Sequence, residues 1–272
     1  MDTLQFLYHT IPGRCVLKVL TRPGISKACG RFLDSDLSHF LIKSFADKHE
    51  IDLSEYELDG VRSFNDFFSR EIKEGLRPID MDEKHLIAPC DGLLSVWKIR
   101  EDTVLPVKQS NYTISSLLRN PKLAAHYRDG YCLVFRLCVK HYHRYCYVDS
   151  GKKSRNVFLP GVLHTVRPIA LAQYPVFTEN SRAYTLIRTP EFGTVVQMEV
   201  GAMLVGRIVN HEQEAQVIRG AEKGMFQYGG STIIVLIGKD QVQMREDLLK
   251  NAQFGVETTV QMGETIGYAK KN

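Results

Sequence analysis

A pair of glycines stands directly before a serine near the end of the sequence, in Gly229-Gly230-Ser231-Thr232. Glycine adopts backbone angles that are closed to other residues, so the pair permits a strained turn. Such a turn matters because a serine hydroxyl attacks the carbonyl before it only when the peptide is bent toward the side chain. Taken alone, the segment is more typical of a bulge or a hairpin corner. Its chemistry therefore depends on what the other residues supply.

Two histidines, His141 and His143, lie two residues apart. On a strand they would share one face, a spacing that zinc sites also use. Cys146 lies three residues beyond His143 and would point to the opposite face, and no third ligand is evident. We therefore predict no metal site.

The composition is that of an ordinary globular protein, with 272 residues, 44% of them hydrophobic and 24% charged. The net charge of +4 is too small to indicate a nucleic-acid partner. Six cysteines without a CxxC pair are expected to be free thiols. The sequence shows neither a signal peptide nor an apolar run long enough to cross a bilayer, so any membrane contact is expected to be peripheral.

The N-terminal part has the pattern of helices. Apolar residues recur at spacings of three and four over residues 33–45, which predicts an amphipathic helix there. A second helix is predicted to begin at Ser63, because Ser63 and Asp66 match a capping box ahead of an apolar run. Residues 3–21 are apolar and basic by turns and are interrupted by Pro12, which predicts a broken amphipathic helix.

Beyond about Pro78 the pattern changes to short apolar or alternating runs separated by turn residues, which is typical of strands. Two segments, IAPCDGLLSVW and VQMGETIGYA, resemble the strand-turn pieces of a barrel-sandwich hybrid fold. We therefore predict an α+β protein, with a helical, membrane-facing N-terminal part (residues 1–75) on a β-rich, barrel-sandwich-like core (residues 76–272). The strand-like runs are LLSVWKI, YCLVFRLCV, YTLIRT, TVVQMEVGAMLVGRIV and STIIVLI.

Residues 1–31 combine basic and apolar side chains and contain one acidic residue, Asp2. This composition favours peripheral binding to an anionic membrane surface, on the cytoplasmic face, over a basic face that is merely solvated. The basic residues are Arg14, Lys18, Arg22, Lys27 and Arg31, and the apolar residues expected to insert are Leu4, Phe6, Leu7, Val16, Leu17 and Leu20.

Several ordered motifs between about residues 60 and 267 resemble those of the phosphatidylserine decarboxylase family. The segment at Ser231 matches that family's cleavage motif, written Leu-Gly-Ser-Thr or Gly-Gly-Ser-Thr. The other motifs, in chain order, are Phe68-Ser-Arg-Glu-Ile-Lys-Glu-Gly-Leu-Arg-Pro-Ile79, Pro89-Cys-Asp-Gly92, Tyr142-His-Arg144, Asn180-Ser-Arg182, and Val200-Gly-Ala202 followed by Val205-Gly206.

The resemblance implies a proenzyme that cuts itself between Gly230 and Ser231, giving chains 1–230 and 231–272 that stay together as a heterodimer. It implies that Ser231 becomes a pyruvoyl group, an electron sink that forms a Schiff base with the substrate amine, so no metal or external cofactor is expected. The implied reaction converts phosphatidylserine in an anionic membrane to phosphatidylethanolamine and CO₂. Association into a homodimer is left open.

The resemblance also implies roles for individual residues. Asp91 and Ser231 match two members of the family's Asp–His–Ser self-cleavage triad, and His143 matches a histidine implicated in decarboxylation. Arg70 and Arg77 would suit a substrate phosphate or carboxylate through bidentate contacts.

The sequence departs from the family where many members carry the triad histidine, because that position is Cys146 here. A thiol with a pKa of about 8.5 is a poor substitute for an imidazole with a pKa of about 6.5. We predict that His164 takes the proton of Ser231 instead, with His141 as the second candidate.

Two other functions are compatible with parts of the sequence. The first is a non-catalytic lipid-binding relative, against which the retained Gly230–Ser231 pair with Asp91 and His143 argues. The second is a pyruvoyl-dependent decarboxylase of a soluble amino acid, against which the basic and apolar N-terminus weighs.

Overall fold

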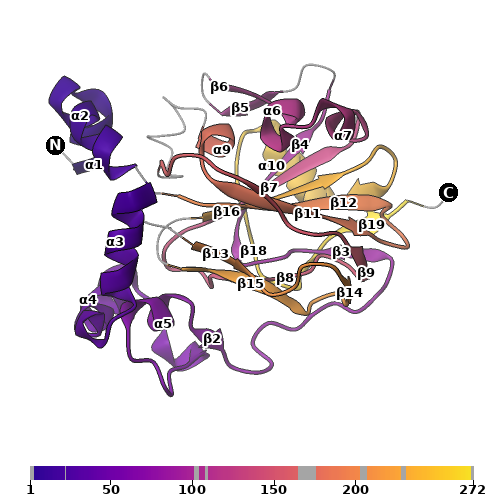
Figure 1. The fold of residues 1–272 in the computed structure, drawn as a ribbon. Coiled ribbons are helices and arrows are strands. Elements are labelled where there is room, and N and C mark those ends of the chain that lie inside the picture. The colour runs from indigo at the N-terminus through magenta and orange to yellow at the C-terminus, as the bar shows by residue number, and fades with distance from the viewer. Residues whose placement is uncertain are drawn as a thin grey trace.

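The computed structural model describes residues 3–21, 23–100, 104–107, 110–164, 176–202, 207–227 and 231–270. Within these ranges the chain forms helices and several antiparallel sheets, which confirms the predicted α+β class. Figure 1 shows the N-terminal helices on one side of the β-rich core. The division of the chain at residue 75 stays a prediction.

The helices are concentrated before residue 70, and the remaining ones are short segments beside the sheets. They are α1 (Thr3–His9), α2 (Ile11–Leu20), α3 (Pro23–Leu33), η1 (Asp36–Ser38), α4 (Leu41–His49), η2 (Leu53–Glu55), α5 (Phe64–Phe68), α6 (Ile114–Leu118), α7 (Pro121–Ala125), α9 (Val176–Glu179) and α10 (Glu246–Gln253).

All the strands except β1 and β2 lie at or after residue 85. They are β1 (Tyr56–Glu57), β2 (Glu71–Ile72), β3 (His85–Ile87), β4 (Gly92–Lys98), β5 (Val104–Val107), β6 (Ser110–Thr113), β7 (Tyr131–Leu137), β8 (Arg144–Cys146), β9 (Gly151–Lys153), β10 (Val157–Leu159), β11 (Arg182–Arg188), β12 (Thr194–Val200), β13 (Arg207–Asn210), β14 (Ala215–Val217), β15 (Glu222–Gln227), β16 (Ser231–Ile237), β17 (Val242–Met244), β18 (Thr258–Val260) and β19 (Thr265–Ala269).

Nine strands form the main sheet, in the order β14-β9-β11-β12-β16-β7-β4-β18, with β10 also paired to β11. Within the described residues this sheet is open, with β14 and β18 at its edges, and not a closed barrel. Two three-stranded sheets, β13-β15-β8 and β17-β19-β3, and two two-stranded sheets, β1-β2 and β5-β6, complete the described part of the fold.

The strand β16 lies inside the main sheet because its sequence, STIIVLI, is rich in β-branched residues and carries no charge. Every residue of β16 is buried. Its neighbours β7 and β12 are likewise mostly buried, so these three strands form the centre of the hydrophobic core. A strand that is buried on both faces reads as a continuous apolar run, which is how this element could be recognised.

The prediction of one continuous helix over residues 33–45 is wrong. The chain instead leaves α3 at Leu33, makes the short 3-10 turn η1, and enters α4 at Leu41. The hydroxyl of Ser38 donates to the Leu33 carbonyl and accepts the amide N–H of Phe64, so it stabilises the break and joins it to α5. Phe40 is consequently exposed although it fits the apolar spacing.

The other two helical predictions are confirmed. A capping box formed by Ser63 and Asp66 begins α5. The segment 3–21 is broken into α1 and α2, with the break at Thr10 and Pro12 inside the first turn of α2, where a missing N–H costs no hydrogen bond.

Candidate active site

Ser231 is the first residue of β16 and faces Leu137 of β7 across the main sheet. It is fully buried, and neither its hydroxyl nor that of Thr232 has a hydrogen-bond partner among the described residues. Buried hydroxyl groups are normally satisfied, so an unpaired one at this position needs a functional explanation. Gly229 and Gly230, where cleavage is predicted, lie outside the described residues.

The chain changes sheets immediately before Ser231. Strand β15 ends at Gln227 in a three-stranded sheet, where Phe226 lies opposite Ile208 of β13, whereas β16 belongs to the main sheet. Gln227 and Ser231 therefore belong to strands of two different sheets.

Asp91 directly precedes β4. In the main sheet β7 lies between β4 and β16, so it pairs with both. The side chain is almost fully buried and accepts a bidentate contact from Arg77, with Nε 2.9 Å from Oδ1 and Nη2 2.7 Å from Oδ2. The backbone N–H of Met262 donates to Oδ1 at 2.9 Å. These contacts fix the orientation of the carboxylate.

Arg77 is largely engaged by this arrangement. Its Nη1 donates to the carbonyl of Leu76, its Nη2 lies 3.7 Å from a carboxylate oxygen of Glu55, and the hydrogen bond to Asp91 raises its pKa above the ordinary range. The geometry thus favours a role for Arg77 in holding Asp91 over the direct substrate contact predicted from the sequence.

An open cavity of about 440 Å³ lies beside this ion pair. Asp91, Arg77 and His141 line it, together with residues of both the helical part and the sheets. The additional lining residues are Glu50, Ile51, Asp52, Glu55, Tyr56, Leu93, Cys138, Lys140, Thr259, Val260 and Gln261.

His143 lies between α5 and the strand that leads to Ser231. Its backbone carbonyl accepts the amide N–H of Phe226, and its ring centroid is 4.0 Å from that of Phe68. Nδ1 lies 2.8 Å from the His141 carbonyl oxygen. Because a carbonyl only accepts, Nδ1 carries the hydrogen and Nε2 carries the lone pair.

The Nε2 atom of His143 is buried and has no hydrogen-bond partner among the described residues. Burial, and secondarily the positive charge of Arg70, lower the pKa of His143 well below 6.5. At neutral pH the imidazole is therefore uncharged and able to accept a proton.

Arg70 is a buried cation in the same region. Its guanidinium lies 4.0 Å from the centre of the Tyr56 ring and donates to the carbonyls of Phe67 and Lys140. Its Nε has no partner among the described residues, and burial lowers its pKa. A buried guanidinium with a donor that no described residue engages is suited to an incoming anion, and the substrate contact expected from the sequence stays a prediction.

His164 occupies a different position, next to the N-terminal helices. Its Nδ1 lies 3.4 Å from the hydroxyl of Tyr8 on α1, and its Nε2 lies 3.7 Å from the carboxylate of Glu179. Its backbone is held by the side chain of Asn180, which also donates to the carbonyl of Gly201. Burial lowers the pKa of His164. Its role as the proton acceptor stays a prediction.

Cys146 is buried beside the segment that carries Asp91. Its amide donates to the Pro89 carbonyl at 2.8 Å, and burial raises the pKa of its thiol to about 12. The thiol is thus neutral near pH 7 and cannot serve as a base. All six cysteines are free, as predicted.

His141 is not on a strand, so the prediction that it shares a strand face with His143 is wrong. His141 lies in a turn that precedes β8, and its amide N–H donates to the Cys138 carbonyl. Its Nδ1 accepts the amide N–H of Cys138, and burial lowers its pKa. Among the described residues no three His, Cys, Asp or Glu side chains are grouped closely enough to hold a metal ion.

Three groups that contact Asp91, Arg77 or Arg70 could not be predicted from the sequence. The Met262 amide, Glu55 and Tyr56 carry no local motif, and Met262 lies 171 positions from Asp91 in the chain. Pairing of that length depends on the tertiary fold, and no spacing rule would have found it.

Comparison with known proteins gives consistent results. The sequence profile of the family described as "Phosphatidylserine decarboxylase" matches residues 64–268. The chain is 43% identical to phosphatidylserine decarboxylase proenzyme 2 of Clostridium acetobutylicum, covering 97% of this chain and 91% of that protein. It is 40% identical to the phosphatidylserine decarboxylase proenzyme of Ruminiclostridium cellulolyticum, with 97% and 90% covered. It is 39% identical to the proenzyme of the same name from Clostridium botulinum, strain Langeland, with 98% and 92% covered.

These relatives are all decarboxylase proenzymes, that is, proteins made as precursors, and the mixed α+β fold with a buried serine at the head of a central strand is compatible with that class. The chain belongs to the phosphatidylserine decarboxylase family.

Proposed function

We propose that this chain is a self-processing phosphatidylserine decarboxylase, which releases CO₂ from phosphatidylserine and leaves phosphatidylethanolamine. The observation that carries the proposal is Ser231, which is buried at the start of β16 and whose hydroxyl has no partner among the described residues. It lies within a match to the family's proenzymes that covers 97% of this chain. A non-catalytic lipid-binding relative gives no reason for this serine to follow a glycine pair. A pyruvoyl-dependent decarboxylase of a soluble amino acid would need the same serine, and the substrate assay below separates it.

Self-processing begins with attack of the Ser231 Oγ on the Gly230 carbonyl carbon, which breaks the peptide C–N bond and gives an ester with a free amine. Elimination across Cα and Cβ of residue 231 then breaks the ester and releases chain 1–230 with a carboxylate terminus. The dehydroalanine left at residue 231 takes up water and loses ammonia, which yields the pyruvoyl group. The site fits this group, because the position is buried and no described residue forms a hydrogen bond with the hydroxyl.

When formed, the pyruvoyl group supplies a ketone that takes up the electrons left by the departing CO₂. The surrounding residues have complementary roles. The neutral His143 offers a proton acceptor at Nε2, and the buried Arg70 attracts the anionic headgroup. Asp91, held by Arg77, supports the activation of Ser231.

The two products of cleavage are expected to remain one molecule. In chain 231–272, β16 lies between β12 and β7, β18 pairs with β4, and β19 pairs with β3, so every one of these pairings joins it to chain 1–230. A strand that is hydrogen-bonded on both edges inside a buried sheet does not leave without unfolding.

The substrate is a membrane lipid, and α1–α3 are the proposed contact surface. Phe6, Ile11 and Val16 are exposed on α1 and α2 next to the exposed cations Arg14 and Lys18. Within the described residues, no helix combines the length and apolar character needed to cross a bilayer.

The predicted inserting face is corrected by the structure. Leu7 and Leu17 belong to the protein core and are buried, so they cannot enter a bilayer. The side chains of Leu4, Arg22 and Lys27 lie outside the described residues.

The test is the intact mass of purified protein combined with a lipid assay. Wild-type protein should show two masses that correspond to chains 1–230 and 231–272, the smaller one blocked by pyruvoyl, and should decarboxylate phosphatidylserine. Ser231→Ala should stay full length and inactive. A single full-length mass with undiminished activity would contradict the mechanism, a full-length inactive wild type would favour a lipid-binding relative, and activity on free amino acids alone would favour a soluble substrate.

A further inference from the structure

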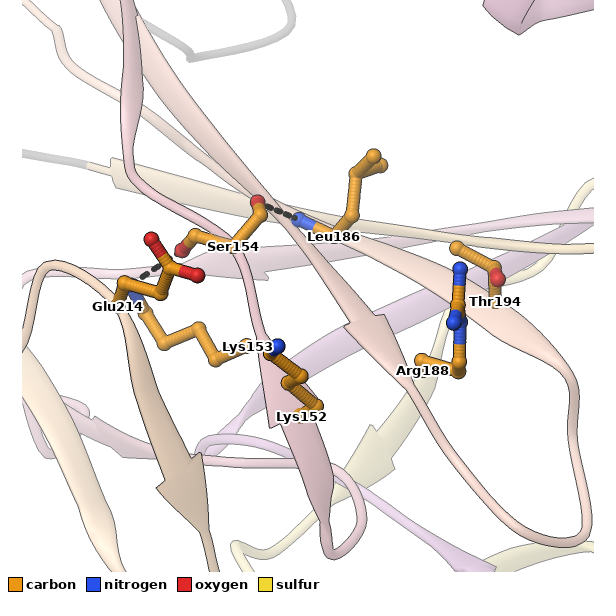
Figure 2. Close-up of a pocket in the computed structure, with 7 residues that line it drawn as sticks. All are labelled: Lys152, Lys153, Ser154, Leu186, Arg188, Thr194 and Glu214. Carbon is orange, nitrogen blue, oxygen red and sulfur yellow. Dashed lines mark hydrogen bonds between the residues drawn. The ribbon is translucent and has the colours of Figure 1, made fainter.

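A second cavity lies at one end of the main sheet, where β9 and β11 pair (Figure 2). Its volume is about 220 Å³. We call this cavity the β9–β11 pocket. It is lined by Lys152, Lys153, Ser154, Leu186, Arg188, Thr194 and Glu214.

The β9–β11 pocket is remote from the candidate active site. Arg188 lies six residues along β11 from Arg182, which faces Val200, and Val200 faces Thr232 next to Ser231. At about 3.3 Å per strand residue, the pocket is roughly 20 Å from the predicted cleavage site. Figure 1 shows β9 and β14 on the opposite side of the β core from α1–α3.

Two cations stand directly opposite each other in this pocket. Arg188 of β11 is the register partner of Lys152 of β9, so both side chains project from the same face, as Figure 2 shows. Like charges in this arrangement destabilise a strand pair. Within the described part of the chain neither cation forms an ion pair, and the carboxylate of Glu214 lies 3.8 Å from Arg155 instead.

The third cation of the pocket does not compete for a ligand. The ammonium group of Lys153 is turned away and donates to the carbonyls of Ser154, Glu212 and Gln213, at 3.0, 2.9 and 2.6 Å. Its three donors are thereby used, and its charge adds to the positive potential. Thr194, opposite Arg188 on the other neighbouring strand β12, adds a hydroxyl group.

We propose that the β9–β11 pocket binds a phosphate group between Lys152 and Arg188. A phosphate would remove the repulsion between the two cations, and its oxygens match the planar donors of arginine and the point charge of lysine. The hydroxyl of Thr194 is placed to donate to a third oxygen. The phosphate can belong to a soluble phosphate ester or to a lipid headgroup, which share this chemistry.

Thermal unfolding of the processed protein tests the proposal, with inorganic phosphate compared with sodium chloride at equal ionic strength. Phosphate at tens of millimolar should raise the Tm of the wild type by about 2–4 °C. Lys152→Ala and Arg188→Ala should lose most of this increase. Lys48→Ala, which removes an exposed cation from α4, is the matched control and should retain it.

Charge reversal separates binding from general stability. Lys152→Glu would face Arg188 with an opposite charge, so its Tm in chloride should be above that of the wild type and should no longer respond to phosphate. A phosphate-dependent increase that is equal in the wild type and in all pocket variants would overturn the proposal, as would a lower Tm of Lys152→Glu in chloride.

Two further probes show whether the bound phosphate belongs to a soluble phosphate ester or to a lipid headgroup. Glycerol 3-phosphate and vesicles that contain phosphatidylglycerol are compared at matched phosphate concentration. A Lys152-dependent increase with glycerol 3-phosphate identifies a soluble ester, and one with vesicles alone identifies a headgroup. The absence of a Lys152-dependent effect with every phosphate probe overturns the site. Because Ser231 is not involved, self-cleavage should be unchanged in all these variants.

Discussion

At the scale of single residues, the site combines groups that are buried without partners. The hydroxyl of Ser231, the Nε2 of His143 and the Nε of Arg70 are all buried polar atoms with no partner among the described residues. Each costs free energy of folding, on the order of 1–3 kcal/mol. His143 and Arg70 lie close enough for the charge of Arg70 to lower the pKa of His143, and buried polar atoms without partners need an explanation other than stability.

The identity of the base in self-cleavage is testable at this scale. We expect His164→Ala to slow self-cleavage by a factor of about 100 or more, the usual loss for a general base. Cys146→Ala should cut normally, because a thiol with a pKa of about 12 takes no part in proton transfer near pH 7. His143→Ala should give cut protein with little decarboxylase activity. The rates are measured by following the full-length band after translation in vitro.

A different pattern would reassign the base. Rapid cleavage of His164→Ala together with uncut His143→Ala would transfer the role to His143, whose Nε2 lone pair has no partner in the part of the chain that the structure describes. If both variants cut normally, attention would move to His141, which lines the cavity with Asp91.

Arg77 gives a second prediction at this scale. Arg77→Ala should slow self-cleavage by a factor of about 10 or more, because Asp91 would lose two charge-assisted hydrogen bonds and its fixed orientation. Arg77→Lys, which keeps the charge but not the bidentate geometry, should recover part of the rate. If Arg77→Ala cuts normally but has a raised KM for phosphatidylserine, the arginine binds substrate as the sequence first indicated.

At the scale of elements, α1 and α2 have to serve two surfaces at once. Leu7 and Leu17 pack into the core, and Tyr8 reaches His164, while Phe6, Ile11 and Val16 remain exposed. Removing residues 1–31 would therefore disturb the core as well as any membrane contact. Point substitutions of exposed residues are the cleaner test.

We expect Arg14→Ala with Lys18→Ala to weaken binding to vesicles rich in anionic lipid by about 30-fold, since each basic residue near such a surface contributes roughly 1 kcal/mol. The loss should shrink as salt is added. Lys43→Ala with Lys48→Ala, an equal change of charge on α4, is the control and should bind as the wild type does. Co-sedimentation measures both, and equal weakening in the control would exclude a specific role for α1 and α2.

At the scale of the whole molecule, the interleaving of strands determines what processing can release. We expect the cut protein to migrate as a single species in gel filtration, with the two masses separating under denaturing conditions. The reason is that β16, β18 and β19 all pair with strands of chain 1–230. Spontaneous release of chain 231–272 in native buffer would show that these pairings do not hold after cleavage.

The dependence of stability on pH is also a property of the whole fold. Burial lowers the pKa of His141, His143 and His164 below 6.5, and that of His143 well below it, so the folded protein binds fewer protons at these imidazoles than the unfolded chain does as the pH falls. Their contribution to stability is present above pH 6.5 and is lost as the pH falls below it. Each imidazole that stays neutral adds a slope of about 1.4 kcal/mol per pH unit.

Urea unfolding of the single-chain Ser231→Ala protein measures this dependence. The free energy of unfolding should fall steadily from pH 6.5 to pH 5, and the added substitution His143→Gln should flatten the curve over that range. A stability that rises on acidification would contradict neutral, buried histidines.

The sequence by itself determined the family and the class of fold, and it predicted the reacting serine. These rest on local patterns: a glycine pair before Ser231, motifs in a fixed order, and the continuous apolar run that makes β16. It also predicted the capping box of α5, because capping depends on residues three positions apart. Such features depend on residues that are close together in the sequence, so they can be predicted from it.

The tertiary structure decided how the residues are used. Arg77 was predicted to bind substrate, but its guanidinium donates to the carboxylate of Asp91, 14 positions away. The amide N–H of Met262, near the C-terminus, donates to the same carboxylate. Burial, which no spacing reveals, fixes the neutral state of His143 and of Cys146. Contacts and desolvation arise from distant segments packing together, and for that reason these roles could not be predicted from the sequence.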